Sequence, residues 1–189
     1  MEQPVLETER LVLRQFTMCD AGRLAELDAD PDVMRFITGG LATSRDDITR
    51  DVLPRFMAWY GRPGGYGCWA AEQKPAGDFL GWFRFHPRRG GPPGEIVLGF
   101  RLRQVAWGKG YATEGSRALL RKGFTELGAL RVVAETMAVN LASRRVLEKA
   151  GLNLVRIFHQ PWPYQVDGRE LGDAEYAVTR AEWEQLNLA

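Results

Sequence analysis

The amino-acid sequence predicts a mixed α+β protein that forms one domain over residues 1–189. Segments that alternate polar and apolar residues, as half-buried strands do, stand between segments with the three-to-four spacing of amphipathic helices. Their order along the chain is strand, helices, three strands, helix, strand, helix, two strands. With 189 residues, 45% hydrophobic and 26% charged, the chain has the size and composition of one globular domain, and no repeat or long linker divides it.

The N-terminal third predicts one strand followed by helices. Residues 8–14 alternate between polar and apolar side chains, which favours a half-buried strand. Apolar side chains at helical spacing predict helices over residues 21–29 and 33–37, separated by an Asp-Pro-Asp break. A longer helix is expected from residue 44 to residue 60, with a kink at Pro54.

Three strands separated by loops come next. They are predicted over residues 66–72, 79–86 and 95–102, where β-branched and aromatic residues are frequent. The intervening segments, residues 74–78 and 87–94, are rich in glycine and proline. Because this composition is typical of turns, we expect a turn or loop in each of them.

The rest of the chain alternates between helices and strands. A helix predicted over residues 111–127 carries a stripe of mostly small side chains that would let it lie close to the sheet: Ala112, Gly115, Leu119 and Gly123. The remaining predicted elements are a strand over residues 132–136, a helix over 140–150 that ends at Gly151, strands over 152–159 and 174–179, and a helix over 180–188.

A glycine-containing turn joins the strand that ends at Leu102 to the helix that begins near Tyr111. The first N–H groups of such a helix lack backbone partners and lie at the positive end of the helix dipole, an arrangement that binds phosphate. Gly108 and Gly110 allow positive φ and close approach of a ligand, and Lys109 adds a positive charge. The alternative is a turn without a ligand, since tight turns favour glycine in any case.

Two common phosphate-binding patterns do not fit this turn. The dinucleotide fingerprint G-x-G-x-x-G fails because Thr113 stands at the third glycine position, and no P-loop string occurs. Residues 107–114, Trp-Gly-Lys-Gly-Tyr-Ala-Thr-Glu, instead resemble the pyrophosphate turn [QR]-x-x-G-x-[GA] of the GCN5-related N-acetyltransferases (GNAT superfamily). The resemblance is to the RimJ/RimL-type branch, the ribosomal-protein N-terminal acetyltransferases and their relatives. Val105 stands where the family pattern has Gln or Arg, with Gln104 one residue earlier.

A second segment carries the same resemblance. Residues 140–151 resemble the string N-x-x-S-x-R-V-L-E-K-x-G-F of that branch, with Leu152 in place of the usual aromatic residue. The order of the predicted elements is also that of the family, so the resemblance extends from Thr8 to Trp183. It implies the acyl-CoA N-acyltransferase fold, a central and mostly antiparallel sheet that is splayed at its middle and flanked by helices, here with the seven strands predicted above.

The resemblance also implies how acetyl-CoA, the cosubstrate, is held. The turn would bind the pyrophosphate, and the pantetheine arm would lie between the strand ending at Leu102 and the strand beginning near Val132, paired with backbone groups of the first strand. The resemblance implies that Asn140 contacts the arm, although asparagine is also a favoured N-cap. The implied cofactor-binding residues are Phe100, Leu102, Trp107, Gly108, Lys109, Gly110, Tyr111, Ala112, Thr113, Asn140, Ser143 and Arg145.

Acetyl transfer to an amine requires two proton movements, because the amine loses a proton and the leaving thiolate gains one. The resemblance implies Ser143 as the proton donor to the thiolate, although a hydroxyl in a first helical turn is also common for capping. Glu95, expected at the cleft end of the strand over 95–102, is the candidate base for an amine whose pKa is about 8 at an N-terminus and about 10.4 in lysine. The alternatives are a solvated glutamate at the strand edge and a water chain without a single base.

Other polar and aromatic residues have two interpretations each. Trp162 and Tyr164, in the loop between the last two strands, are expected either at the wall of the acceptor cleft or over one end of the core. Four basic residues are either contacts for the ribose 3′-phosphate or ordinary solvated side chains, namely Lys109, Arg144, Arg145 and Lys149.

Composition argues against several other classes. The net charge is +1 with basic residues scattered along the chain, so no large nucleic-acid-binding face is expected. No apolar run reaches membrane-spanning length, and the first residues lack a signal-peptide pattern. Cys19 and Cys68 are expected as free thiols in a reducing cytoplasm. His86 and His159 are isolated, so no metal site is expected.

The sequence therefore predicts an enzyme, an N-acetyltransferase in which a primary amine attacks acetyl-CoA directly. A protein N-terminus and a small-molecule amine both remain as acceptors, because the fold does not determine the substrate. Two alternatives stay open: an acyl-CoA-binding module without turnover, acting as a sensor or partner protein, and a general nucleotide-binding domain. The branch often forms homodimers and the late strands supply edges, so a homodimer is expected.

Overall fold

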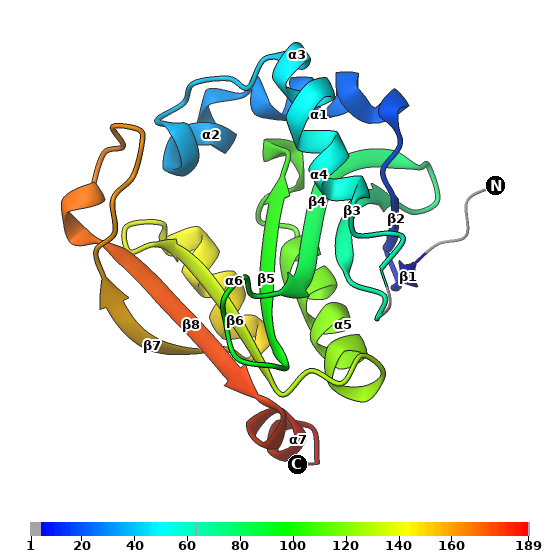
Figure 1. Ribbon diagram of the computed structural model, residues 1–189, viewed down its shortest axis with the longest axis vertical. Helices are drawn as coiled ribbons and strands as arrows, with labels where there is room; N and C mark the ends of the chain where they lie inside the picture. The colour runs from blue at the N-terminus through cyan, green and yellow to red at the C-terminus, as the bar shows by residue number, and fades with distance from the viewer. Residues whose placement is uncertain (1–4, 63, 189) are drawn as a thin grey trace.

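One eight-stranded sheet forms the centre of the protein in the computed structural model, which describes residues 5–62 and 64–188 (Figure 1). The strand order is β1-β2-β3-β4-β5-β6-β8-β7, and neighbouring strands are antiparallel except for β5 and β6. The mixed, mostly antiparallel sheet predicted from the sequence is confirmed. Residues 1–4, where the sequence lacks a signal-peptide pattern, lie outside the described residues.

The elements have the following bounds. The strands are β1 (Leu6–Glu7), β2 (Leu11–Gln15), β3 (Gly67–Gln73), β4 (Asp78–Pro87), β5 (Glu95–Leu102), β6 (Arg131–Met137), β7 (Asn153–Phe158) and β8 (Asp173–Thr179). The helices are α1 (Ala21–Asp28), α2 (Pro31–Thr38), α3 (Arg45–Asp47), α4 (Leu53–Met57), α5 (Tyr111–Thr125), α6 (Leu141–Ala150) and α7 (Arg180–Leu188). The short turns are η1 (Met18–Asp20), η2 (Ile48–Val52, a π-helical turn), η3 (Gln104–Ala106) and η4 (Arg169–Leu171).

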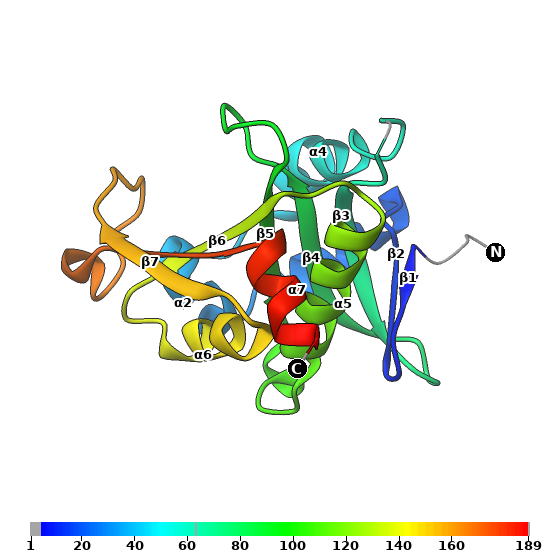
Figure 2. The same cartoon turned by 90° about the horizontal axis from the view of Figure 1, so that it is seen from below.

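Helices cover both faces of the sheet, and the strands alternate accordingly (Figures 1 and 2). On β4, the rings of Phe83 and Phe85 belong to the core that includes α5 and α6, whereas Trp82 belongs to the core beneath α1 to α4. The period of two along a strand produces this division. Side chains on the α1–α4 face therefore lie opposite to those that pack on α5.

Helix α5 lies close against the sheet because glycines replace side chains at the contact. A Cβ on Gly115 would stand 2.4 Å from the Phe83 ring, and a Cβ on Gly123 would stand 2.5 Å from the Phe85 ring. These distances are shorter than any van der Waals contact between carbons. The stripe of small residues predicted from the sequence thus has the packing role expected for it, and it holds the N-terminus of α5 firmly beside β5.

The parallel strands β5 and β6 separate in the middle of the sheet. They pair only from Glu95 to Val97 on β5 and from Arg131 to Val133 on β6, and beyond these residues the strands diverge (Figure 1). On its other side β5 stays paired with β4 as far as Leu102. The sheet is therefore splayed at its middle, as the family resemblance implied, and the second half of β5 has an unpaired edge.

Two N-terminal predictions were wrong in detail. The strand predicted over residues 8–14 begins only at Leu11, because residues 8–10 form the turn between β2 and an additional short strand, β1. The single helix predicted over residues 44–60 is divided into α3, the π-helical turn η2 and α4, which ends at Met57. Pro54, which has no N–H to donate, is the second residue of α4 and is separated from η2 by Leu53, so the irregular turn comes before the proline rather than at it.

Candidate active site

The turn between β5 and α5 has the geometry of an anion site. After the short helical turn η3, Gly108 and Gly110 adopt φ values of 70° and 85°, which favour glycine. Gly110 is the N-cap of α5 and provides no side chain to cap it. The N–H groups of residues 111–113 donate to no acceptor in the described part of the chain. These donors, together with the helix dipole, lie open to an anionic ligand.

Side chains around the turn hold it in place. The indole N–H of Trp107 donates to the carbonyl of Leu102 at 2.8 Å, and Arg10 Nη1 donates to the carbonyl of Lys109 at 2.9 Å. The side chain of Tyr111 is buried beneath the Arg10 guanidinium, 4.7 Å from its ring centre. Among the predicted cofactor residues, Trp107 and Tyr111 thus use their side chains for structure, and Tyr111 presents only its N–H to a ligand.

Glu114 ties the first turn of α5 to the N-terminal strands. Its carboxylate accepts hydrogen bonds from the hydroxyl of Thr8 at 2.6 Å and from the backbone N–H and side chain of Arg10 at 2.9 and 2.7 Å. Burial acts to raise the pKa of Glu114, but these hydrogen bonds outweigh it and leave the pKa below its ordinary value. Sequence reasoning assigned Glu114 only to the helix dipole, and it missed Arg10 because that residue was read as part of a strand.

The open half of β5 leads from this turn into the middle of the sheet. Phe100 is half-buried, with its ring 6.1 Å from that of Phe83, and Leu102 is buried. Past Val97, the edge of β5 that faces β6 has no strand partner among the described residues. An extended chain in this gap could pair with the backbone of β5 as an added strand would.

The N-terminus of α6 stands across the gap from the turn. Because β5 and β6 are parallel, their C-terminal ends lie at the same edge of the sheet. The helices that follow them, α5 and α6, therefore both begin at that edge. Asn140 caps α6, its Oδ1 accepting the N–H of Ser143 at 3.1 Å, which confirms the capping interpretation of Asn140. Ser143 is half-buried, and its hydroxyl has no hydrogen bond to a described residue, so it is available to a ligand.

The basic residues named as phosphate contacts have different surroundings. Arg144 donates to the hydroxyl of Tyr176 at 2.9 Å and to the carbonyl of Ala138 at 3.0 Å, so its guanidinium is held within the protein. Lys149 stands near the far end of the ten-residue helix α6, about 13 Å along its axis from Asn140. Lys109 and Arg145 are exposed and remain candidates.

Glu95 does not lie at the cleft end of β5, as predicted, but at the end where β5 and β6 are paired. It is 5% exposed, so it is not the solvated glutamate of the alternative either. Its carboxylate forms ion pairs with Arg131 on β6 and, at 3.3 Å, with Arg88. Arg131 also contacts Glu175 on β8 at 3.4 Å, so these pairs hold the strands together where the gap closes. The role of Glu95 as a base stays a prediction.

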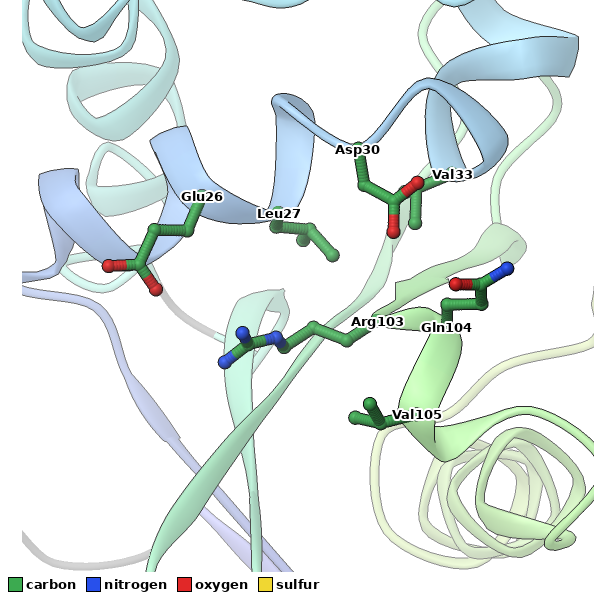
Figure 3. Close-up of a pocket in the computed structure, with 7 residues that line it drawn as sticks. All are labelled: Glu26, Leu27, Asp30, Val33, Arg103, Gln104 and Val105. Atoms are coloured by element: carbon green, nitrogen blue, oxygen red, sulfur yellow. The ribbon is translucent and has the colours of Figure 1, made fainter.

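A small pocket of about 120 Å³ lies beside the turn, between helices α1 and α2 and the residues that follow β5 (Figure 3). It is lined by Glu26, Leu27, Asp30, Val33, Arg103, Gln104 and Val105. Near it, the amide of Gln104 donates to Asp32 at 3.1 Å, so the Gln104 side chain is held toward α2. Val105 has an apolar side chain, so the position where the family pattern has Gln or Arg has no side-chain donor here.

The loop between β7 and β8 approaches α2, one of the two helices beside the pocket (Figure 1). The indole N–H of Trp162 donates to the carbonyl of Ile37 at 2.9 Å, and Arg169 lies 5.2 Å from the ring centre of Trp162. Trp162 and Tyr164 are both exposed. Neither side chain is buried in a core, and the loop and α2 together flank the open end of the gap.

This arrangement places an open strand edge beside a turn with unpaired N–H groups, which suits an extended ligand that carries phosphate. The acetyltransferase (GNAT) domain family matches residues 10–153, well over half of the chain. The chain therefore belongs to the GNAT acetyltransferase family, and it is an acetyl-CoA-dependent N-acetyltransferase.

Two relatives show the extent of the similarity. The FsC-acetyl coenzyme A-N(2)-transacetylase of Aspergillus fumigatus is 34% identical over 194 residues, which cover 96% of this chain and 78% of the relative. The uncharacterised N-acetyltransferase YnaD of Bacillus subtilis is 28% identical over 184 residues, covering 94% of this chain and 98% of the relative.

Solved structures share the fold. A GNAT-family acetyltransferase from Bacillus anthracis superposes with a TM-score of 0.77 at 26% identity, covering 93% of this chain and 98% of that one. RimL, an L7/L12 α-N-protein acetyltransferase solved with coenzyme A, has a TM-score of 0.75 at 18% identity, covering 94% of this chain and 98% of that one. At this identity the likeness to RimL shows the fold alone.

Among residues 5–62 and 64–188, no helix combines the length and the apolar character that crossing a membrane requires. The same residues contain no group of three or more His, Cys, Asp or Glu side chains placed to hold a metal ion. Cys19 is exposed and Cys68 is buried, and both are free thiols as expected.

Proposed function

We propose that this protein acts as one cytoplasmic domain that transfers the acetyl group of acetyl-CoA to the primary amine of a small molecule by direct attack. The observation that carries the proposal is the unpaired edge of β5, which runs directly into a turn whose N–H groups at residues 111–113 have no described acceptor. An anionic group and an extended arm bind there together, and family membership identifies the ligand as acetyl-CoA.

Different residues bind different parts of acetyl-CoA. The pyrophosphate binds the N–H groups after Gly108, with Lys109 and Arg145 as the exposed cations nearby. The arm pairs with β5 between Gly99 and Leu102, and the amide of Asn140 contacts it from the other side of the gap. A backbone N–H of β5 then polarises the thioester carbonyl.

The reaction forms a nitrogen–carbon bond and breaks the carbon–sulfur bond of the thioester. The amine nitrogen loses its proton to water, and water carries it to Glu95, the candidate acceptor, which lies on the α1–α4 face at the closed end of the gap. The leaving thiolate of CoA takes a proton from the hydroxyl of Ser143, which has no other described partner, and Ser143 regains a proton from water.

A small-molecule acceptor has more support than a protein N-terminus. The relative at 34% identity is named for transfer to the N2 position of FsC, and its similarity covers 96% of this chain. The protein N-terminal alternative rests on the RimJ/RimL-like segments at residues 107–114 and 140–151, and RimL itself is 18% identical. An aminoglycoside acetyltransferase solved with coenzyme A has a similar fold at 21% identity, which shows that the fold serves other acceptors too.

Thermal unfolding with acetyl-CoA, and with ATP and NAD as controls, tests cosubstrate binding first. A ligand at a hundred times its Kd raises the free energy of unfolding by about 2.7 kcal/mol, so a selective shift with acetyl-CoA is expected. Release of free CoA thiol with a panel of small amines and N-terminal peptides then tests turnover. A shift without turnover of any acceptor would favour the non-catalytic module, and equal shifts with ATP would favour a general nucleotide-binding domain.

We also propose a homodimer that forms through β7. This strand is at the edge of the sheet, and its apolar side chains Leu154, Val155 and Ile157 are 45–50% exposed. An apolar edge strand readily pairs with another chain. Light scattering during size-exclusion chromatography is expected to give twice the mass of the chain, and Val155→Lys is expected to return it to a monomer.

A further inference from the structure

Arg84 on β4 is a partly buried cation without a partner. Its Nε is fully buried and has no hydrogen bond, and its guanidinium forms no hydrogen bond or ion pair with any described residue. Burial lowers the pKa of Arg84 from its ordinary value. Because removing a cation from water is unfavourable unless it is paired, such a residue points to a counter-charge that arrives with a ligand.

The other charges on this face of β4, β5 and β6 are already balanced. Arg101, the arginine neighbouring Arg84, forms an ion pair with the buried carboxylate of Asp28. The closed end of the gap carries three arginines and three glutamates that pair with one another: Arg88, Arg131 and Arg156 with Glu95, Glu135 and Glu175. Burial raises the pKa of Cys68, the cross-strand neighbour of Arg84, so that thiol is neutral. One positive charge, that of Arg84, is left over.

The unpaired guanidinium lies at the edge of the gap. Arg84 is paired in register with Gly99 on β5, and a Cβ on Gly99 would stand 2.4 Å from Arg84 Nε and about 3 Å from its Cγ and Cδ. The side chain therefore lies flat across β5 at Gly99 instead of standing off the sheet. Gly99 is two residues past Val97, the last residue of β5 that pairs with β6.

The face of the sheet determines which ligand can meet this charge. Arg84 is on the α1–α4 face, with Trp82 and Cys68, whereas α5 and α6 cover the other face. The anion-binding turn at residues 108–113 lies beyond the end of β5, at least three residues, or about 10 Å, from Gly99. A phosphate held at that turn therefore does not neutralise Arg84.

We infer that Arg84 binds a carboxylate of the acceptor, so that the acceptors are amines that carry a carboxylate near the reacting nitrogen, such as amino acids. The inference rests on the proposed function, since it requires the thioester to lie in the gap beside Gly99. Arginine is suited to this task because its planar fork donates two parallel hydrogen bonds to a carboxylate. Gly99 is a positioning residue, because any side chain there would push the guanidinium away from the gap.

Paired acceptors that differ only in the carboxylate test the inference. Acetyl transfer is measured with amino acids and with the corresponding amino-acid amides, in the wild-type protein and in Arg84→Gln. The wild type is expected to prefer the acid by about 10- to 100-fold in kcat/KM, the range for a hydrogen bond to a charged group, and the variant to lose that preference. Gly99→Ala is expected to reduce the preference in the same direction. Arg89→Gln, the same change on an exposed loop residue, serves as the matched control and is expected to keep it.

Binding is measured separately from turnover. In 15N-labelled protein with CoA bound, propionate is expected to shift the Nε–H resonance of Arg84 in a saturable manner, and propionamide is not. An unmoved resonance, an equal loss of acid and amide turnover in Arg84→Gln, or an unchanged acid preference in that variant would each overturn the inference. Acetylation of amines without acid preference would overturn it and leave the proposed function intact. Failure to bind acetyl-CoA at all would overturn the proposed function instead.

Discussion

The carboxylate of Glu114 lies 2.6 Å from the guanidinium of Arg10, and the same guanidinium donates to the carbonyl of Lys109 in the anion-binding turn. Glu114→Gln removes the charge that orients Arg10. Because Arg10 is 42% exposed, we expect a loss of only about 1 to 2 kcal/mol in the free energy of unfolding. We also expect a three- to tenfold weaker Kd for acetyl-CoA, roughly 1 kcal/mol. Glu126→Gln, at the C-cap of the same helix and 59% exposed, is the control and should change neither value in urea unfolding and calorimetry.

The lowered pKa values of Glu114 and Glu175 predict loss of stability in acid. For Glu175, burial acts to raise the pKa, but the hydrogen bond from Arg156 and the charges of the nearby arginines outweigh burial and lower the pKa. A carboxyl whose pKa is lower in the folded state stabilises that state above the unfolded pKa of about 4.3. The stabilisation is lost as pH falls from there through the lowered folded pKa. Urea unfolding from pH 7 to pH 3 should show this loss, and Glu114→Gln should show less of it; an equal loss would assign it to other groups.

Gly108→Ala should weaken acetyl-CoA binding at least about tenfold, because an alanine at φ of 70° costs about 1 to 2 kcal/mol and moves the turn. Gly77→Ala is the matched control. Gly77 has a φ of 78° in the loop between β3 and β4, and a Cβ there meets no atom within 4 Å, as at Gly108. Both variants should lose similar stability in thermal unfolding, but only Gly108→Ala should lose affinity. Equal affinities in the two variants would mean that the turn does not bind the ligand.

Ser143→Ala should reduce kcat without reducing stability, because its hydroxyl has no described hydrogen bond in the folded protein. If the hydroxyl protonates the thiolate, the reduction is expected to be about 10²- to 10⁴-fold. Asn140→Ala should instead lower the free energy of unfolding by about 1 kcal/mol, through loss of the α6 cap. The two variants are compared by CoA-thiol release and by thermal unfolding. Unchanged kcat in Ser143→Ala would leave Ser143 without a chemical role.

Glu95→Gln distinguishes two roles for this residue, that of a catalytic base and that of a structural ion-pair partner. As an ion-pair partner, the buried carboxylate balances Arg131 and Arg88, and its neutralisation should cost about 3 to 5 kcal/mol of stability. As a base, its loss should remove the acidic limb from the pH profile of kcat/KM and lower the rate at every pH where the variant is folded. We expect the stability loss, and the profile decides whether Glu95 also accepts a proton. Glu135→Gln, at the more exposed side of the same network, is the comparison.

Periodicity and turn chemistry were sufficient for most of the fold. The strand over Glu95–Leu102 and the helix over Arg180–Leu188 have the predicted bounds, because alternation and helical spacing are local properties of the chain. The error over residues 8–14 has a tertiary cause. Thr8 and Arg10 leave the strand to bind Glu114, more than a hundred residues away, and no local pattern encodes that contact.

The parts of the site that the backbone forms could be predicted from the sequence. The parts that depend on side-chain partners could not. The turn at Gly108 and Gly110 and the helix cap at Asn140 depend on few neighbouring residues, so the local sequence predicts them. Whether Arg144 is free or bound to Tyr176 depends on a strand that lies 32 residues later in the chain. The placement of Glu95 depended on which end of β5 opens, and that is set by its pairing with β6.

The open edge of β5 has a consequence for how such a protein changes over evolutionary time. In the proposed function, main-chain groups of β5 bind the cosubstrate in the gap, and no point mutation removes a main-chain carbonyl. Side chains on the α1–α4 face can therefore be exchanged to suit a new amine while the hold on the cosubstrate is inherited. Arg84 and the residues around the β7–β8 loop can change with the acceptor, whereas the backbone of the sheet, which holds the cosubstrate, stays the same.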